Sequence, residues 1–192
     1  MTTLYQKLTI VGDSRCGKTS LLIVFADGNF PELDVPSWFS SCITVDVDGQ
    51  PAAAMLSLFD TFCAPGVERD RGCPLGYPKT DVFLLCFAVD DHNSLRNVRD
   101  KWMPEISHFC LGVPVLLVAC KTDLRDALNA TEEKPMYASD SKRGPFAIGI
   151  RVHYVECSAK LGEGVTEVFH NAAAACLRAE RARHHRRLCA VV

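Results

Sequence analysis

The segment Gly12–Thr19 has the residue types and the spacing that suit phosphate binding. It reads GDSRCGKT, a full match to GxxxxGK[ST], directly after the apolar run Leu8–Val11 and at the start of a helical pattern. Backbone N–H groups of such a loop surround phosphates, the lysine neutralises β- and γ-phosphate oxygens, and the last hydroxyl ligates Mg²⁺. We therefore expect a phosphate site made by Gly12, Asp13, Ser14, Arg15, Cys16, Gly17, Lys18, Thr19 and Ser20.

A second metal ligand is predicted at Asp60, which ends the apolar run Ala54–Phe59. An isolated aspartate after a strand is usually a turn former or a helix cap. Together with the phosphate loop, its carboxylate suits the second protein ligand that a nucleotide-bound Mg²⁺ requires. The sequence therefore predicts a Mg²⁺ site that includes Thr19 and Asp60.

Two further motifs follow the last two apolar runs. Cys120–Asp123 reads CKTD and Cys157–Lys160 reads CSAK. A lone KxD carries no information, but in order and spacing the four elements resemble the guanine-nucleotide fold of the small GTPases of the Ras superfamily. The stretches KLTIVGDSRCGKTSLL, FPELDVPSWF, YPKTDVFLLCFAV, KWMPEISHFC, CKTDLRD and YVECSAK resemble the Rho family, with a phosphate loop similar to that of the atypical Rnd-like members.

This resemblance implies GTP or GDP and Mg²⁺ as ligands. It implies that Lys121 and Asp123 recognise guanine, with the aspartate accepting hydrogen bonds from the ring N1 and the exocyclic amine. Ser37 would reach Mg²⁺ when a γ-phosphate is present. The base pocket would be completed by Phe30, Cys120, Ser158, Ala159 and Lys160, where Cys120 replaces the threonine or asparagine of many relatives.

The residues that would catalyse hydrolysis differ from the family pattern. Where the family has DTAGQ, this chain has Asp60-Thr61-Phe62-Cys63-Ala64. Ala64 cannot orient a water molecule, and the Cβ of Cys63 restricts a backbone that glycine leaves free. Ser14 adds a side chain beside the transferred phosphoryl group. We therefore expect no catalytic residue at these positions and weak or absent GTP hydrolysis.

Two alternatives within the same fold remain open: an ordinary cycling GTPase, and a scaffold that does not respond to the nucleotide. An ATP-using kinase would need a lid with arginines and an acceptor site. The combination of Lys121 and Asp123 with Ser158–Lys160 argues against that class.

The elements that must position these residues alternate between strands and helices. Six strands are expected at Leu8–Val11, Cys42–Val47, Ala54–Phe59, Val82–Val89, Val113–Cys120 and Val152–Glu156, and helices at Lys18–Phe25, Ser94–Phe109 and Gly164–Arg183. The pair Asp48-Gly49 favours a tight hairpin, so one strand pair is expected to be antiparallel. The prediction is an α/β fold, a six-stranded, mostly parallel sheet with helices on both faces.

Composition excludes several classes of protein. The 192 residues are 48% hydrophobic and 23% charged with a net charge of −2, which is not the composition of a nucleic-acid binder or of a disordered chain. The ten cysteines are scattered without CxxC spacing, and the N-terminus has no signal-peptide pattern, so we expect a reducing cytosolic setting.

The C-terminus predicts a lipid anchor. Cys189-Ala190-Val191-Val192 fits the prenylation pattern C-a-a-X, and the preceding RARHHRR segment supplies basic residues for an anionic membrane. We expect a nucleotide-binding domain over residues 1–178 and a lipidated tail over 179–192. The expected location is the cytoplasmic face of the plasma membrane or of endomembranes, with a cytosolic pool.

Partner surfaces are implied by the resemblance. Effectors would bind two switch segments, Asp34 to Ser41 and Asp60 to Pro78, while exchange factors and a guanine-nucleotide dissociation inhibitor are further expected partners. We expect a monomer that does not bind nucleic acid. Trp102 is expected to pack a helix onto the sheet, and Trp38 to contact effectors.

Overall fold

A computed structural model describes residues 4–32, 40–47, 50–60, 76–125 and 152–189. The strands are β1 (Leu4–Gly12), β2 (Ser40–Val47), β3 (Gln50–Asp60), β4 (Val82–Ala88), β5 (Val115–Cys120) and β6 (His153–Glu156). The helices are α1 (Lys18–Asp27), α2 (His92–Asn97), the π-helical segment η2 (Val98–Trp102), α3 (Met103–Phe109) and α6 (Val165–Cys189).

The strands form one sheet in the order β2-β3-β1-β4-β5-β6. Strand β2 pairs with β3 in the antiparallel direction, and the other neighbouring pairs are parallel. The predicted α/β fold, in which helices cover a sheet of mainly parallel strands, is confirmed. Because β1, β4, β5 and β6 run in the same direction, their carboxyl ends share one edge, where ligands bind in folds of this kind.

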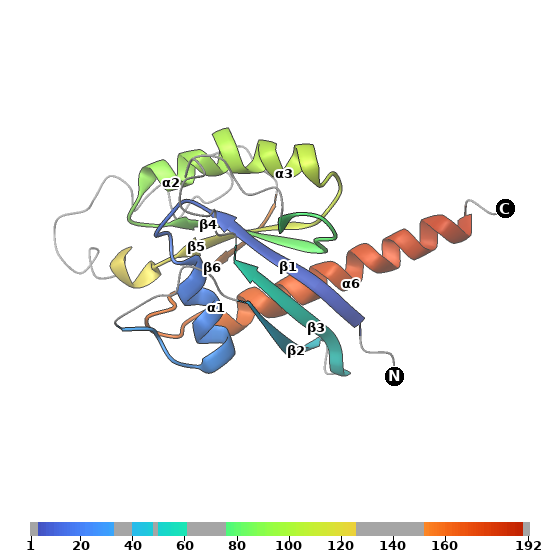
Figure 1. Ribbon diagram of the computed structural model, residues 1–192, viewed down its shortest axis with the longest axis horizontal. Coiled ribbons are helices and arrows are strands. Elements are labelled where there is room, and N and C mark those ends of the chain that lie inside the picture. Colours follow the sequence, from blue (N-terminus) through green and yellow to red (C-terminus); the bar gives the residue numbers. More distant parts are fainter. Residues whose placement is uncertain (1–3, 33–39, 48–49, 61–75, 126–151, 190–192) are drawn as a thin grey trace.

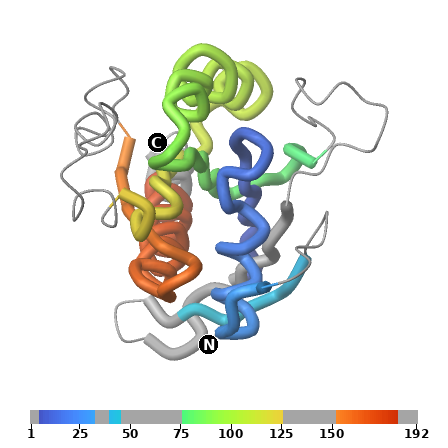
Figure 2. The backbone as a smooth tube through the Cα atoms, turned by 90° about the vertical axis from the view of Figure 1, so that its left-hand side faces the viewer, coloured from blue at the N-terminus to red at the C-terminus, as the bar shows by residue number. Residues whose placement is uncertain are grey.

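Helices cover both faces of the sheet. Figure 1 shows α1 and α6 on one face and the α2-η2-α3 segment on the other, and Figure 2 shows the same layers end on. All seven residues of β4 are buried, since alternate side chains join two separate cores. Phe25 of α1 stacks on Phe169 of α6 with ring centroids 3.7 Å apart, which fixes the two helices to one another.

The helix predicted at Ser94–Phe109 is interrupted by the π-helical segment η2. Pro104, in the first turn of α3, has no N–H for the carbonyl of Asp100, and in a regular α-helix its ring would clash with that carbonyl. A wider turn before the proline avoids this conflict. The sequence analysis missed this segment because the apolar pattern on either side is continuous.

Helix α6 is longer than predicted, since it ends at Cys189 instead of Arg183. Its sequence contains no glycine or proline that would stop it. The boundary predicted between residues 178 and 179 therefore lies inside a continuous helix. Among the described helices, none combines the length and the apolar character that a membrane span needs.

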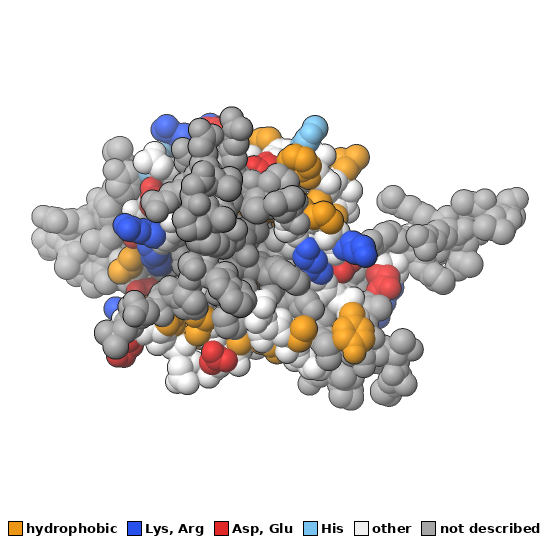
Figure 3. Space-filling view, viewed as in Figure 1, with side chains coloured by type: hydrophobic (Ala, Val, Ile, Leu, Met, Phe, Trp, Pro, Cys, Tyr) orange, Lys and Arg blue, Asp and Glu red, His pale blue; other side chains and the backbone are white. Residues whose placement is uncertain are grey.

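Charged side chains of both signs are distributed over the described part of the surface in Figure 3, with apolar side chains between them. This distribution agrees with the small net charge of −2. No continuous basic area is seen among the described residues of this face.

Gly164 is the glycine before α6 whose replacement should destabilise the fold most clearly. Its φ is +69°, and an added Cβ would lie 2.3 Å from the carbonyl oxygen of Glu156. We expect Gly164→Ala to lower the free energy of unfolding by about 1–3 kcal/mol more than Gly162→Ala does. Gly162 is the matched control, because its φ is +72° and an added Cβ would meet nothing within 4 Å. Urea denaturation of both variants measures the difference, and equal stabilities would contradict the close approach.

Candidate functional site

The phosphate loop joins β1 to α1 in a conformation that depends on left-handed backbone. Gly12, Arg15 and Gly17 have φ values of 144°, 63° and 103°. Gly12 admits no side chain, because a Cβ there would lie 2.1 Å from the carbonyl oxygen of Cys86 in β4. The loop thus lies directly over the carboxyl end of β4 and leads into the N-terminus of α1, whose first N–H groups favour anions.

Lys18 crosses the loop that precedes it. Its Nζ donates to the carbonyl oxygens of Gly12, at 3.1 Å, and Asp13, at 2.7 Å. The ammonium group is therefore held at the concave side of the loop, where phosphate oxygens would enter. The Lys18 ammonium group thus supplies one positive charge, and the N-terminus of α1 adds the partial positive charge of the helix dipole.

The predicted Mg²⁺ ligands are described only in part. Thr19 lies in the first turn of α1, and its side chain is partly buried. Asp60 is the last residue of β3 and pairs in parallel register with Ile10 of β1, which places its backbone one strand away from the phosphate loop. Ser37 lies outside the described residues.

Asp13 is bound by the helical segment on the far side of the loop. Its Oδ2 accepts a hydrogen bond from Asn97 Nδ2, and its Oδ1 accepts one from Trp102 Nε1, both at 2.7 Å. Asn97 and Trp102 are five residues apart, which in an α-helix would turn them about 140° away from each other. The i→i+5 turn of η2 brings them to the same side.

The sequence analysis missed these two hydrogen bonds to Asp13, which we call the Asp13 clamp. Trp102 is buried, as predicted for a residue that packs a helix onto the sheet, but its indole N–H also holds the phosphate loop. Pro104, which breaks the helical pattern, is the sequence signal that could have indicated an irregular turn here. The clamp directs the Asp13 carboxylate toward two neutral donors on the α2-η2 segment.

The other end of the site is a cavity of about 220 Å³ between the phosphate loop, β5 and the chain that follows β6. Phe30 lines it with a side chain that is 38% exposed. The remaining lining residues come from the end of the phosphate loop, from α1, and from the two predicted base motifs and the residue after the first of them: Gly17, Ser20, Leu21, Cys120, Lys121, Asp123, Leu124, Cys157, Ala159 and Lys160.

Asp123 is held in place by Ser158. Its Oδ1 accepts a hydrogen bond from Ser158 Oγ at 2.6 Å, and the same hydroxyl oxygen accepts one from the N–H of Leu161 at 3.2 Å. Ser158 is itself fully buried. The carboxylate therefore faces the cavity from a fixed position, as an acceptor for a ligand that has N–H donors.

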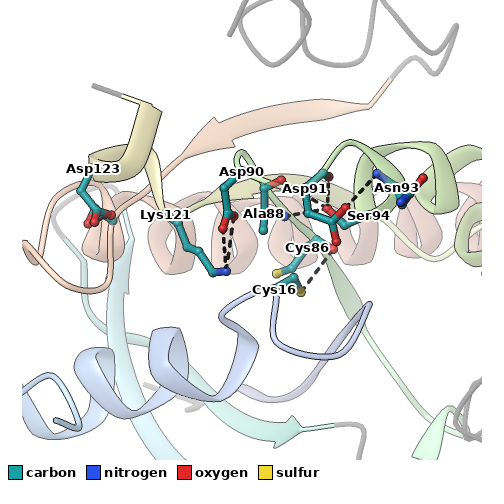
Figure 4. A network of polar contacts seen from close by, with 10 residues as sticks. Cys16, Cys86, Ala88, Asp90, Asp91, Asn93, Ser94, Lys121 and Asp123 are labelled. Atoms are coloured by element: carbon teal, nitrogen blue, oxygen red, sulfur yellow. Dashed lines mark hydrogen bonds and ion pairs between the residues drawn. The ribbon is translucent and has the colours of Figure 1, made fainter. Parts of the chain in front are cut away.

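Lys121 is positioned by strain and by charge. It is one of the non-glycine residues with a left-handed backbone, with φ at 63°. Its Nζ lies 3.3 Å from both carboxylate oxygens of Asp90, which follows β4, and Figure 4 shows this pair beside Asp123. Lys121 lines the cavity, and its ammonium group is directed toward Asp90.

Backbone hydrogen bonds bring the two base motifs together. The N–H of Cys157 donates to Ala119 at 2.8 Å, and the N–H of Thr122 donates to Cys157 at 3.3 Å. Residues 157–160 and 120–123 are therefore parts of one wall, although more than thirty positions separate them in the chain.

Four buried thiols lie under this site, on Cys16, Cys86, Cys120 and Cys157. Burial raises the pKa of Cys16 to about 12, and its Sγ donates to the carbonyl oxygen of Cys86 at 3.7 Å (Figure 4). Cys120 differs from its neighbours: hydrogen bonds from the thiols of Cys157 and Cys86 lower its pKa well below the usual range. The sequence analysis did not connect these four cysteines, because each belongs to a different motif.

The structure thus brings together the phosphate loop, Phe30, Cys120–Asp123 and Ser158–Lys160 around one opening at the sheet edge. Ser14 is exposed. The positions predicted to impair hydrolysis, Cys63 and Ala64, lie outside the described residues, as does most of both switch segments.

Residues 7–178 match the family model described as "Ras family". The chain is 45% identical to "GTP-binding protein RHO1" of Candida albicans, over 98% of this chain and 96% of that protein. It is 47% identical to "GTP-binding protein rho5" of Schizosaccharomyces pombe, over 92% and 89%, and 44% identical to human "Rho-related GTP-binding protein RhoB", over 92% and 91%. The chain therefore belongs to the Rho family of small GTPases, within the Ras superfamily.

Proposed function

We propose that this protein is a membrane-anchored GTP-binding switch for cytoskeletal, polarity or trafficking signals, and that it hydrolyses GTP weakly or not at all. The observation that carries the proposal is a cavity lined both by Asp123, which Ser158 fixes, and by Gly17 at the end of the loop that Lys18 braces. One side can accept hydrogen bonds from a base, and the other can bind phosphates.

Guanine suits the base side of this cavity. Its N1–H and exocyclic amine are two adjacent donors, and the Asp123 carboxylate has two acceptor oxygens. Adenine presents a bare N1 lone pair in the same region and would leave the carboxylate facing an acceptor. Phe30 would flank the ring edge-on, and Lys121 lines the same cavity.

The phosphate side suits a nucleotide with Mg²⁺. The Lys18 ammonium and the loop N–H groups would bind β- and γ-phosphate oxygens. Thr19, Asp60 and Ser37 supply a hydroxyl, a carboxylate and a second hydroxyl, which are the oxygen ligands that Mg²⁺ prefers. When bound, the ion would neutralise charge on the phosphates.

Weak hydrolysis follows from the residues that would act on the attacking water. Ala64 has no group that orients water, and Cys63 carries a Cβ where the family pattern has glycine. Ser14, which resembles the Rnd-like phosphate loops, adds a side chain where an arginine from an activating protein would enter. These changes leave the residues of the binding site in place.

A competition experiment tests the binding proposal. Protein stripped of nucleotide and loaded with a fluorescent GDP analogue is titrated with unlabelled GTP and with ATP. We expect GTP to displace the analogue and ATP to fail at a hundredfold excess. Displacement by both nucleotides at similar concentrations would contradict the role of Asp123.

Membrane attachment is proposed to depend on Cys189. This residue ends helix α6, and the segment before it contains five arginines between positions 178 and 187. One lipid chain binds membranes only marginally, so the basic residues would supply the second signal. We expect Cys189→Ser to move the protein from the membrane fraction to the cytosol in cells. Val191→Ala is the control, because it keeps the cysteine, and an unchanged membrane fraction in Cys189→Ser would contradict lipidation.

We further propose that the protein acts as a monomer and binds effectors through Asp34–Ser41 and Asp60–Pro78. Exchange factors and a guanine-nucleotide dissociation inhibitor are proposed regulators. These proposals rest on membership of the Rho family.

A further inference from the structure

We propose that Asn97 and Trp102 are positioning residues for the nucleotide. By holding the Asp13 carboxylate, they keep the phosphate loop in its binding conformation and slow the release of bound GDP or GTP. Both side chains act through Asp13, and neither is among the residues that line the base cavity. This inference rests on the proposed function, because it requires that the loop binds the phosphates of a nucleotide.

Asp13 connects the clamp to Lys18. Its backbone carbonyl oxygen accepts hydrogen bonds from Lys18 Nζ at 2.7 Å and from the N–H of Cys16 at 3.4 Å. Its carboxylate accepts hydrogen bonds from Asn97 and Trp102, both at 2.7 Å. A shift of Asp13 would therefore move the carbonyl group that Lys18 contacts, and with it the ammonium group that is expected to bind phosphate oxygens.

The clamp also determines where the negative charge of Asp13 lies. A carboxylate in a phosphate loop repels phosphates, and the repulsion grows as the distance between the charges shortens. The two N–H donors bind one carboxylate oxygen each and hold the charge on the side of the loop that faces α2 and η2. If one donor is removed, the carboxylate loses a charge-assisted hydrogen bond and can turn toward the phosphates.

The two donors lie on a segment that is fixed to the sheet at both ends. Val98 is fully buried and Trp102 is 6% exposed, and both belong to the core on this face of the sheet. The N–H of Met103 donates to the carbonyl oxygen of Val98, five residues earlier, which is the hydrogen bond of a π turn. Before this turn, Ser94 Oγ accepts a hydrogen bond from the N–H of Ala88 in β4 at 3.0 Å (Figure 4). A support of this kind can hold the loop in one position.

The rate of GDP release tests the inference. The full-length chain is loaded with a fluorescent GDP analogue and Mg²⁺ and mixed with excess unlabelled GDP, and the loss of fluorescence gives the dissociation rate. Trp102→Phe keeps an aromatic ring but removes the indole N–H. We expect it to release the analogue about 10-fold faster than the parent, since one hydrogen bond to a charged group is lost.

Two further variants complete this measurement. Asn97→Ala should accelerate release by a similar factor, and because Asn97 is only half-buried the variant leaves the core intact. Arg99→Ala is the matched control and should release the analogue at the rate of the parent. Arg99 lies in the same π turn, but its side chain is exposed and donates to Asp100 instead of Asp13.

A double-mutant cycle separates positioning from packing. If Trp102 acts through Asp13, the double variant Asp13→Ala/Trp102→Phe should release the analogue at the rate of Asp13→Ala alone, because no carboxylate remains to be held. A role in packing alone would give the same acceleration with and without the carboxylate. The same cycle with Asn97→Ala does not depend on how well Trp102→Phe folds.

The indole N–H of Trp102 provides a spectroscopic signature. The chain contains two tryptophans, so a ¹⁵N-labelled sample gives two indole signals, and Trp38→Phe identifies the signal of Trp102. In the GDP-bound chain we expect this N–H to exchange slowly with solvent. Asp13→Ala should shift the signal and speed the exchange.

Three results would overturn the inference. They are release at the parent's rate in Trp102→Phe or in Asn97→Ala, equal acceleration with and without the Asp13 carboxylate, and a Trp102 indole signal that Asp13→Ala leaves unchanged. Failure of the parent chain to bind the analogue would instead overturn the proposed function.

Discussion

Asp123→Asn is expected to weaken GDP binding by about 10²–10⁴-fold, because hydrogen bonds to a charged group contribute about 1.5–3 kcal/mol each and two would be lost or reversed. An asparagine presents one acceptor and one donor, and its N–H₂ group would face a donor of guanine. Xanthine has a carbonyl where guanine has its exocyclic amine. The variant should therefore gain affinity for XDP relative to GDP.

Isothermal titration with GDP and XDP measures this change. Glu163→Gln is the matched control, because it converts an exposed carboxylate of the neighbouring turn to an amide without touching the cavity. Ser158→Ala should give an intermediate loss, since it removes the hydroxyl that donates to Asp123 Oδ1 at 2.6 Å. A GDP affinity in Asp123→Asn equal to that of the parent would show that the base does not bind here.

Lys18→Ala is expected to weaken GDP binding by about 10²–10³-fold, because a charge pair at about 4 Å near a protein surface is worth about 4 kcal/mol before losses to solvent. The substitution also removes the two hydrogen bonds from Nζ to the carbonyl oxygens of Gly12 and Asp13, which brace the loop.

Arg15→Ala is the control for Lys18→Ala. It removes one positive charge from the same loop, but only the backbone N–H of Arg15 is expected to contribute to the phosphate site, since its side chain is exposed. We expect a change of less than about threefold in GDP affinity, as is usual for an exposed charge. Equal losses in the two variants would mean that only the net charge of the loop matters.

Much of the fold could be predicted from the pattern of apolar residues and from the glycines that end helices. The apolar runs locate the described strands to within a few residues, and Gly17 and Gly28 delimit α1. The motif GxxxxGK[ST] indicated the loop because its glycine positions have a steric cause: at Gly12 the carbonyl oxygen of Cys86 leaves no room for a side chain. A short motif is sufficient where each of its positions has its own steric requirement, as at Gly12, and where a glycine ends a helix, as at Gly28.

Three features were not predicted, and two of them depend on contacts between distant segments. The Asp13 clamp requires the π turn of η2, whose apolar pattern looks like ordinary helix. The C-terminal end of α6 is difficult to predict, because no glycine or proline within the helix marks where it stops. The thiol cluster arises because β4, β5 and the chain after β6 end beneath one loop, and no spacing rule links those cysteines.

The central claim is that the site binds GTP without acting efficiently on it. A single-turnover assay tests this claim most directly: the purified chain is loaded with GTP, Mg²⁺ is added, and the GTP remaining on the protein is followed over time with and without a Rho-type activating protein. Ala64→Gln serves as the comparison, because it restores a side chain that can orient water. We predict that the parent chain keeps GTP bound in both conditions while Ala64→Gln hydrolyses it faster. Hydrolysis by the parent at the rate of an ordinary small GTPase, or a large acceleration by the activating protein, would contradict the account.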